Sequence, residues 1–211
     1  MTEINDVIYR DFEKRDIPEL ATLVAGIWNP TLKGETALMA GKVDLAHFAV
    51  RATHWKVAEL DGEVVGVAAV RVGDPVEEDV RFWSNLSDDA FAKLKQLSLE
   101  AEKALKVYYD FENKAHDQML KYCDCDTTYE LTLFAVSSKA RGHGVGSELL
   151  RQMTDHLKEA GAKNYFLYTD TNCSWQYYEN RGMKRCTTYV AEDETHEQLN
   201  GQELYIYSTS I

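Results

Sequence analysis

The segment Val136-Ser-Ser-Lys-Ala-Arg-Gly-His-Gly-Val-Gly-Ser147 constrains the fold of this chain more than any other part of the sequence. It follows an alternating strand pattern, Tyr129 to Val136, and precedes a helical pattern, Ser147 to Ala160, that ends at Gly161. Glycines let the main chain approach a ligand closely, and the N-terminus of a helix attracts phosphate. The pattern therefore predicts either a phosphate-binding loop or a flexible turn between a strand and a helix.

Two standard phosphate-binding motifs do not fit this loop. A P-loop ends in Gly-Lys-Ser/Thr, whereas Gly146 is followed by Ser147 and Glu148. The dinucleotide-binding spacing G-x-G-x-x-G also fails, because Ser147 stands three residues after Gly144, where the third glycine is required. The loop therefore belongs to neither class.

The patterns around the loop predict an α/β fold, with a mixed α+β sheet that carries helices on its faces. The turn Asp61-Gly62 joins two strand patterns into a hairpin, because Asp-Gly supplies the positive φ that a tight turn needs. The other expected strands cover 7–10, 129–136, 164–169, 183–190 and 203–210, and the expected helices cover 17–27, 35–51, 147–160 and 174–180.

Residues 74–128 are expected to form a helical insertion between the third and fourth strands of a single domain that spans 1–211. Ser87 is the expected cap of a helix. Behind it, apolar residues from Leu94 to Met119 repeat at spacings of three and four, which fits one continuous helix or two. This stripe must pack either on the main domain or on a second subunit, so a homodimer remains open.

Two motifs in the chain are similar to those of the GNAT superfamily of acyl-CoA-dependent N-acetyltransferases. Arg141-x-x-Gly144-x-Gly146 matches the R/Q-x-x-G-x-G/A signature of that family. Tyr177 to Met183 resembles its later F/L-Y-E-x-x-G-F segment, although Met183 replaces the usual Phe. With the strand that ends at Val136, the resemblance covers about residues 129–190.

The resemblance implies the GNAT fold and acetyl-CoA as the co-substrate. Backbone N–H groups of the loop would hold the diphosphate, and the fourth and fifth strands would separate to admit the pantetheine arm beside the fourth strand. Asn172 lies one position away from the common Asn of the family. The cofactor-binding candidates are Phe134, Ala135, Val136, Arg141, Gly142, His143, Gly144, Val145, Gly146, Ser147 and Asn172.

Transfer to an amine needs a base and an acid. A lysine-like amine has a pKa of about 10.4, so its deprotonation at pH 7 costs roughly 4.6 kcal/mol. By its distance from Arg141, Glu130 matches the catalytic glutamate of the histone-acetyltransferase branch, and a glutamate that faces solvent is the alternative. A water chain or a carboxylate of the insertion could also serve as the base. Tyr178 stands where the family carries its general-acid tyrosine, and Tyr177 is expected in the core.

The charge of the chain argues against nucleic-acid and membrane partners. Lys plus Arg is 23 and Asp plus Glu is 35, which gives 23 − 35 = −12. Residues 74–128 contain 13 acidic and seven basic residues, so they hold half of the net charge. A small cationic amine is therefore the expected acceptor. A protein amine, a non-catalytic acyl-CoA-binding sensor, and a merely solvated acidic surface are the alternatives.

The remaining signals concern location and metals. The first residues have neither the basic start nor the apolar stretch of a secretory signal, and the four cysteines are too few for a disulfide framework, so a cytoplasmic protein is expected. Cys123 and Cys125 lack a second Cys/His pair at zinc spacing, and we expect no metal. Cys173 needs no covalent role, because direct transfer requires no protein nucleophile.

Overall fold

The computed structural model describes residues 7–191, 199 and 201–211 of the chain. The strands in this part form one mixed sheet in the order β1-β2-β3-β4-β5-β7-β6, in which β4 and β5 are the parallel neighbours. They are β1 (Ile8–Asp11), β2 (His54–Leu60), β3 (Glu63–Val72), β4 (Tyr129–Val136), β5 (Asn164–Asp170), β6 (Lys184–Val190) and β7 (Glu203–Ser210). The expected α/β class with a mixed sheet is confirmed.

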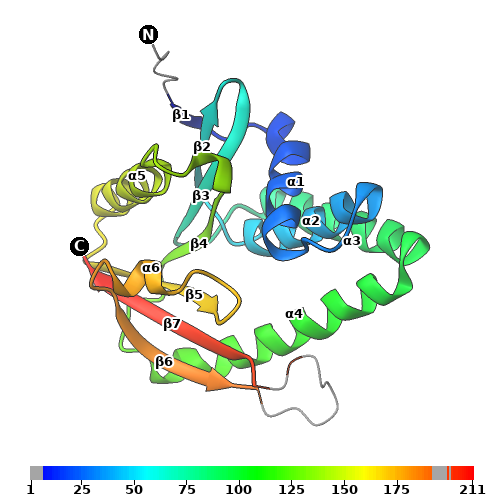
Figure 1. Ribbon diagram of the computed structural model, residues 1–211. Coiled ribbons are helices and arrows are strands. Elements are labelled where there is room, and N and C mark those ends of the chain that lie inside the picture. The colour runs from blue at the N-terminus through cyan, green and yellow to red at the C-terminus, as the bar shows by residue number, and fades with distance from the viewer. Residues whose placement is uncertain (1–6, 192–198, 200) are drawn as a thin grey trace.

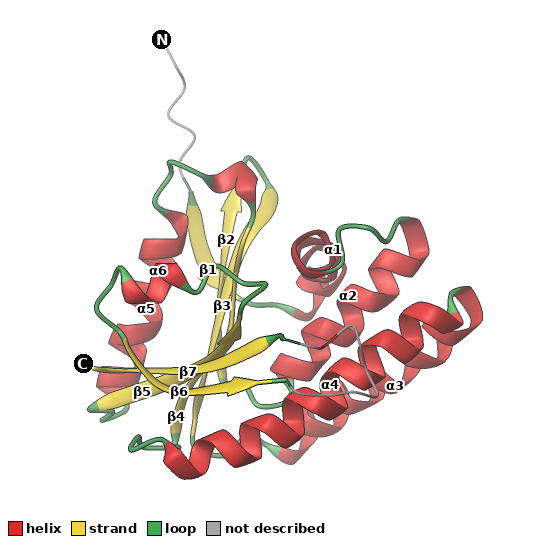
Figure 2. Cartoon of the chain, turned by 60° about the horizontal axis from the view of Figure 1, so that its bottom comes forward, coloured by secondary structure: helices red, strands yellow, loops and turns green. Residues whose placement is uncertain are grey.

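Helices cover both faces of this sheet (Figure 1). One face carries α1 (Ile17–Trp28), α2 (Gly34–Ala49), α3 (Glu77–Leu97) and α4 (Leu99–Met119), and the other carries α5 (Val145–Glu159) and α6 (Gln176–Glu179). Figure 2 shows the two groups on opposite sides of the strands. The short 3-10 turns are η1 (Lys14–Asp16), η2 (Leu120–Tyr122) and η3 (Ser138–Ala140).

Each face of the sheet has its own apolar core. Helix α5 buries Leu149, Met153 and Leu157 against one face, whereas α1 and α2 bury Leu20 and Leu45 against the other. Full burial of such a side chain stabilises a fold by about 1.5–3 kcal/mol, so both layers are needed to hold the sheet. Burial on both faces also explains why β3 is apolar over most of its length.

The hairpin between β2 and β3 forms at the predicted dipeptide. Asp61 has φ = 53° and Gly62 has φ = 81°, so both turn residues adopt the left-handed conformation. Two consecutive positive φ values define a turn whose twist matches that of the flanking strands. The hairpin prediction is confirmed.

The helices between β3 and β4 begin and end at residues other than those predicted. The expected start at Ser87 is wrong, because α3 begins at Glu77 with three acidic residues in its first turn and continues through Ser87. The chain then breaks at Ser98, whose side chain accepts a hydrogen bond from the Ala101 N–H at 3.2 Å and caps α4. Two helices therefore form, not one.

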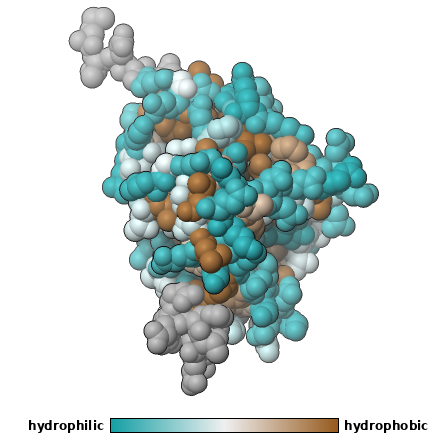
Figure 3. All heavy atoms as spheres, turned by 90° about the vertical axis from the view of Figure 1, so that its right-hand side faces the viewer, coloured by the Kyte–Doolittle hydropathy of each residue, from teal (hydrophilic) through white to brown (hydrophobic). Residues whose placement is uncertain are grey.

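The apolar stripe of α3 and α4 packs inside the same chain. Leu94 and Leu105 pack with Val43 of α2, and further along α4, Met119 packs against Phe166 of β5. On this side of the molecule, hydrophobic atoms are scattered in separate spots among hydrophilic ones (Figure 3). Part of the stripe is thus covered by the same chain, whereas Leu97 and Ala104 are exposed.

Candidate active site

The strands β4 and β5 separate near the middle of the sheet. Their one registered pair is Glu130 with Phe166. Beyond it, β4 continues to Val136 paired with β3, and β5 continues to Asp170 paired with β7. Within the described residues, the edge of β4 that faces β5 therefore has no strand partner past Glu130. An extended ligand can form hydrogen bonds with the main chain at such an edge.

A β-bulge lies in β4 where the two strands begin to separate. Ala69 of β3 pairs with Leu133 and Val70 pairs with Leu131, so Thr132 is an extra residue without a Cα partner. Its hydroxyl donates to the Ala69 carbonyl at 3.2 Å. Bulges of this kind change the direction of the following side chains and are frequent beside active sites. Nothing in the sequence pattern indicates this bulge.

The loop that precedes α5 has the properties of an anion site. Gly142 (φ = 84°) and Gly144 (φ = 70°) adopt left-handed conformations, and a Cβ at either position would meet nothing within 4 Å. Gly144 is the N-cap of α5, and no side chain caps that end of the helix. The first amides of α5 are therefore left for a ligand, and the positive end of the helix dipole favours a negative one. These residues fit the diphosphate of acetyl-CoA.

Gly146 brings three predicted segments together. A Cβ at this position would lie 3.4 Å from the Phe134 ring, 3.4 Å from the Tyr177 hydroxyl oxygen and 3.7 Å from a methyl of Val136. The start of α5 therefore lies against the end of β4 and against α6. The other loop candidates, Arg141 and His143, are exposed, and the Nδ1 atom of His143 lies 3.2 Å from the Arg141 carbonyl oxygen.

The two tyrosines of α6 occupy different environments. Tyr178 is buried among the side chains under α5, and burial raises its pKa well above the usual value, so its hydroxyl stays protonated. Tyr177 is partly buried and packs on Phe134 with ring centroids 5.4 Å apart. The expectation that Tyr177 is the core residue is therefore wrong, because the short helix turns Tyr178 inward and Tyr177 toward the loop.

Asp170 shapes the turn after β5. Its carboxylate accepts hydrogen bonds from the backbone N–H groups of Asn172 at 2.7 Å and Cys173 at 3.0 Å. Asn172 is exposed in this turn. Burial and the nearby Asp170 raise the pKa of the Cys173 thiol to about 12, so the thiol stays protonated and is a poor nucleophile.

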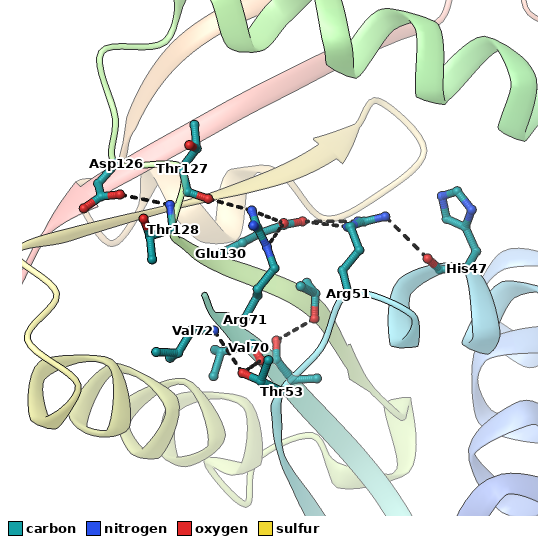
Figure 4. Close-up of polar contacts among 12 residues, drawn as sticks. His47, Arg51, Thr53, Val70, Arg71, Val72, Asp126, Thr127, Thr128 and Glu130 are labelled. Carbon is teal, nitrogen blue, oxygen red and sulfur yellow. Dashed lines mark hydrogen bonds and ion pairs between the residues drawn. The ribbon is translucent and has the colours of Figure 1, made fainter. Parts of the chain in front are cut away.

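Glu130 lies between two arginines on the face opposite α5 (Figure 4). One carboxylate oxygen accepts from Arg51 Nη2 at 3.2 Å, and the other accepts from Arg71 Nε at 3.1 Å. The side chain of Glu130 is 2% exposed, so the alternative of a glutamate facing solvent is wrong. Two cations compensate the buried charge. Arg71 could have been found from strand register, since it pairs with Glu130, whereas nothing in the sequence indicates Arg51.

A second buried group of polar side chains joins α2 to α4. Asp44 of α2 accepts hydrogen bonds from the Tyr109 hydroxyl at 2.5 Å and from Asn29 Nδ2 at 2.6 Å. His47 of α2 lies with its Nε2 atom 2.8 Å from a carboxylate oxygen of Glu112 in α4. Burial alone would raise the pKa of Glu112, but the contacts with His47 and with a second histidine hold it below its usual value.

That second histidine, His116, connects α4 to β5. Its ring stacks on Tyr168 with centroids 3.5 Å apart, and its Nε2 atom is 3.7 Å from Glu112. Burial lowers the pKa of His116 to about 4, so it is neutral at pH 7. About two helical turns before His116, the Tyr108 hydroxyl donates to Asp170 at 2.8 Å. The insertion therefore supplies a buried carboxylate, Glu112, on the same face as Glu130.

The carboxyl group of Asp44 predicts a pH-dependent stability. Burial raises the pKa of Asp44 to about 7, although hydrogen bonds from Tyr109 and Asn29 oppose the shift. In the unfolded chain, an aspartate has a pKa of about 3.9. The folded protein keeps this proton where the unfolded chain has released it, so the free energy of unfolding should fall as the pH rises from about 4 to about 7.

We expect Asp44→Asn to remove this component of the pH dependence, because asparagine does not titrate. Urea titrations at about pH 5 and about pH 7 measure it, and the fall in unfolding free energy should be smaller in the variant than in the unmodified protein. An equal fall in unfolding free energy in both proteins would show that Asp44 is ionised in the folded protein over this whole pH range.

The structure offers little support for other site classes. In residues 7–191, 199 and 201–211, no group of three or more His, Cys, Asp or Glu side chains could hold a metal ion. Cys123 and Cys125 are joined by a disulfide. Among the helices of the described part, none has the length and apolar character needed to cross a membrane.

Comparison with known proteins gives a family and a fold. The sequence profile of the acetyltransferase (GNAT) family matches residues 27–183. Similar solved structures include the ribosomal-protein-S18-alanine N-acetyltransferase from Escherichia coli (12% identity, TM-score 0.54, covering 98% of this chain and 94% of that one). The ribosomal-protein-alanine N-acetyltransferase from Brucella melitensis (18%, 0.53, 97% and 99%) and the IAA acetyltransferase from Bacillus cereus (14%, 0.52, 98% and 100%) are also similar. No curated protein matches the chain.

Proposed function

Because this chain belongs to the GNAT family of acetyltransferases, we propose that it transfers an acetyl group from acetyl-CoA to the primary amine of a small cationic acceptor. The family assignment makes it an acyl-CoA-dependent N-acetyltransferase, and the acceptor class is the new element. When bound, acetyl-CoA supplies an acetyl group activated as a thioester.

The gap between β4 and β5 supports a division of the site between two faces. On one face, the uncapped N-terminus of α5 and the glycine loop fit a diphosphate. On the other face lie Glu130 and the polar side chains of α2 and α4. A ligand that passes through the gap would therefore present its thioester to the second face, where the acceptor would approach.

The single observation that carries the acceptor class is the charge of that second face. Four buried carboxyl groups, those of Asp44, Glu112, Glu130 and Asp170, are gathered there. Two guanidinium groups, from Arg51 and Arg71, accompany them. Asp44, whose pKa burial raises to about 7, holds its proton up to that pH, and the two guanidinium groups compensate Glu130. The negative charge that favours an approaching cation therefore comes from Glu112, Asp170 and the surrounding segment 74–128, which has 13 acidic and seven basic residues.

Two side chains would handle the protons. Glu130 would take the proton of the acceptor ammonium, directly or through water, so that the neutral amine can attack. Tyr178 would donate its hydroxyl proton to the departing sulfur, and burial raises the pKa of this hydroxyl, which keeps it protonated before that step. The protein thus needs no covalent intermediate, which agrees with the protonated thiol of Cys173.

Thiol release from acetyl-CoA in the presence of different amines tests the acceptor class. We expect small diamines or polyamines to be acetylated faster than neutral amines and faster than peptides with a free α-amino group. Faster acetylation of peptides would replace the small-molecule acceptor by a protein one. Binding of acetyl-CoA without turnover of any amine would instead indicate a sensor.

Removal of the Tyr178 hydroxyl tests the role of this residue as the general acid. Tyr178→Phe keeps the ring that packs near Tyr207 and removes the proton donor. We expect the turnover number to fall by about 10²-fold, the low end of the range for general acid catalysis, with little change in acetyl-CoA affinity. Steady-state rates and a binding titration measure the two quantities. An unaltered turnover number would remove Tyr178 from the mechanism.

A further inference from the structure

An arginine that no part of the mechanism uses lies beside the N-terminus of α5. Arg181 follows α6 in the turn before β6, and its side chain reaches back to α5. Its Nη2 atom donates to the Ser147 hydroxyl oxygen at 2.7 Å, and its guanidinium carbon lies 3.5 Å from the centroid of the Tyr177 ring. Two side chains therefore fix the direction of this guanidinium.

The charge of Arg181 has no counter-charge in the described part of the chain. Nearby Arg185 is paired with Glu179 at 2.6 Å, and Arg151 of α5 is paired with Glu148 at 2.6 Å. Arg181, by contrast, contacts a hydroxyl, an aromatic ring and a carbonyl. An ordered and uncompensated guanidinium is a ready binding group for an anion.

Two further features lie at the same place. The Tyr177 hydroxyl is buried, with the Ser147 side chain beside it. A Cβ at Gly146 would lie 3.4 Å from it, so this hydroxyl lies at the first turn of α5. Gly144 provides no side-chain cap for that turn. A guanidinium without a counter-charge thus lies beside a helix N-terminus without a side-chain cap, and this combination fits an anionic ligand.

We propose that Arg181, held by Tyr177 and Ser147, is a second binding group for the diphosphate of acetyl-CoA, opposite the main-chain amides of the glycine loop. The inference rests on the proposed use of acetyl-CoA. Ser147 is the third residue of α5, so the guanidinium lies one hydrogen bond from the turn whose amides face the diphosphate. Because the Arg181 guanidinium lies beside these amides, we expect it to bind the diphosphate and not the 3′-phosphate.

Calorimetric titrations with three ligands test the assignment. Coenzyme A carries both the diphosphate and the 3′-phosphate, dephospho-coenzyme A lacks the 3′-phosphate, and pantetheine lacks all phosphates. We expect Arg181→Met to raise the Kd of coenzyme A and of dephospho-coenzyme A by the same factor, about tenfold or more, as for a lost hydrogen bond to a charged group. The Kd of pantetheine should not change.

Matched variants separate this role from a general effect of charge. Arg151→Met removes an arginine of α5 that is already paired with Glu148, and all three dissociation constants should stay unchanged. Tyr177→Phe keeps the ring under Arg181 and removes the hydroxyl, so it should weaken binding of both diphosphate ligands by a smaller factor. The dependence of Kd on salt should also become weaker in Arg181→Met.

Two results would overturn the proposal. A loss of affinity for coenzyme A alone would assign Arg181 to the 3′-phosphate, and unchanged dissociation constants for all three ligands would leave it without a binding role. Failure of the proposed use of acetyl-CoA would look different, since the unmodified protein would then bind neither coenzyme A nor dephospho-coenzyme A.

Discussion

Replacing Glu130 by glutamine is expected to slow acetyl transfer by roughly 10²- to 10⁴-fold, the range that a positioned general base contributes. Glutamine has nearly the same shape and keeps one oxygen as an acceptor for Arg51 or Arg71, but it cannot accept the proton of the ammonium group. The rise of the rate on the low-pH side of the profile should flatten as well, because the group that must lose its proton is absent.

A second glutamate provides the matched control. Glu112 is also buried on the same face, and it is the carboxylate that the insertion contributes. Glu112→Gln should reduce the rate much less than Glu130→Gln if Glu130 is the base. The reverse order would transfer the role to Glu112. If neither variant changed the pH profile, the proton would have to leave through a water chain.

Loss of stability must be separated from loss of the base in Glu130→Gln. The carboxylate lies between Arg51 and Arg71, and removal of one member of a buried ionic group can cost about 3–5 kcal/mol. Urea titrations and acetyl-CoA affinity of the variant therefore accompany the rate measurement. A folded variant that binds acetyl-CoA normally and transfers slowly isolates the chemical step.

Replacing Gly41 by alanine is expected to destabilise the fold by about 3 kcal/mol, at the upper end of the cost of overpacking. A Cβ at this position in α2 would lie 1.9 Å from the Ala21 carbonyl oxygen and 2.9 Å from the Ala25 Cβ of α1. The obstacle is main chain, so α1 and α2 must move apart. Their contact positions the helix that carries Asp44 and His47.

The neighbouring helix offers a control for this substitution. Gly26 lies in α1, and a Cβ there would meet nothing within 4 Å. Gly26→Ala should therefore stabilise the protein by about 0.5–1 kcal/mol, because alanine favours a helix over glycine. Urea unfolding of both variants measures the difference. Equal stability of Gly41→Ala and the unmodified protein would show that α1 and α2 are less closely packed than described.

Local patterns were sufficient to predict most elements of the fold. The β4 strand and the Asp61-Gly62 hairpin were predicted because alternation and turn chemistry act within a few residues. The start at Ser87 failed because the acidic first turn from Glu77 begins the helix earlier, and Ser98 provides the cap where the chain turns. Several good local signals compete in this segment, and tertiary packing on α2 selects among them.

The site was less predictable, because its geometry depends on segments that are distant in the sequence. The loop of Gly142 and Gly144 could be found from spacing, since its function depends on adjacent residues. The pairing of Arg51 with Glu130 joins residues 79 positions apart, and the contact of Arg181 with Ser147 joins residues 34 apart. Neither contact has a local signal.

Hydrogen–deuterium exchange with and without acetyl-CoA tests the central claim most directly. The proposal places the cofactor against the amides of residues 142–147 and along the free edge of β4 at 134–136. Exchange at both segments should become slower when acetyl-CoA is added to the unmodified protein at saturating concentration. Slower exchange confined to other segments, or no change anywhere in the chain, would contradict the location of the cofactor site and with it the division of the active site between the two faces of the sheet.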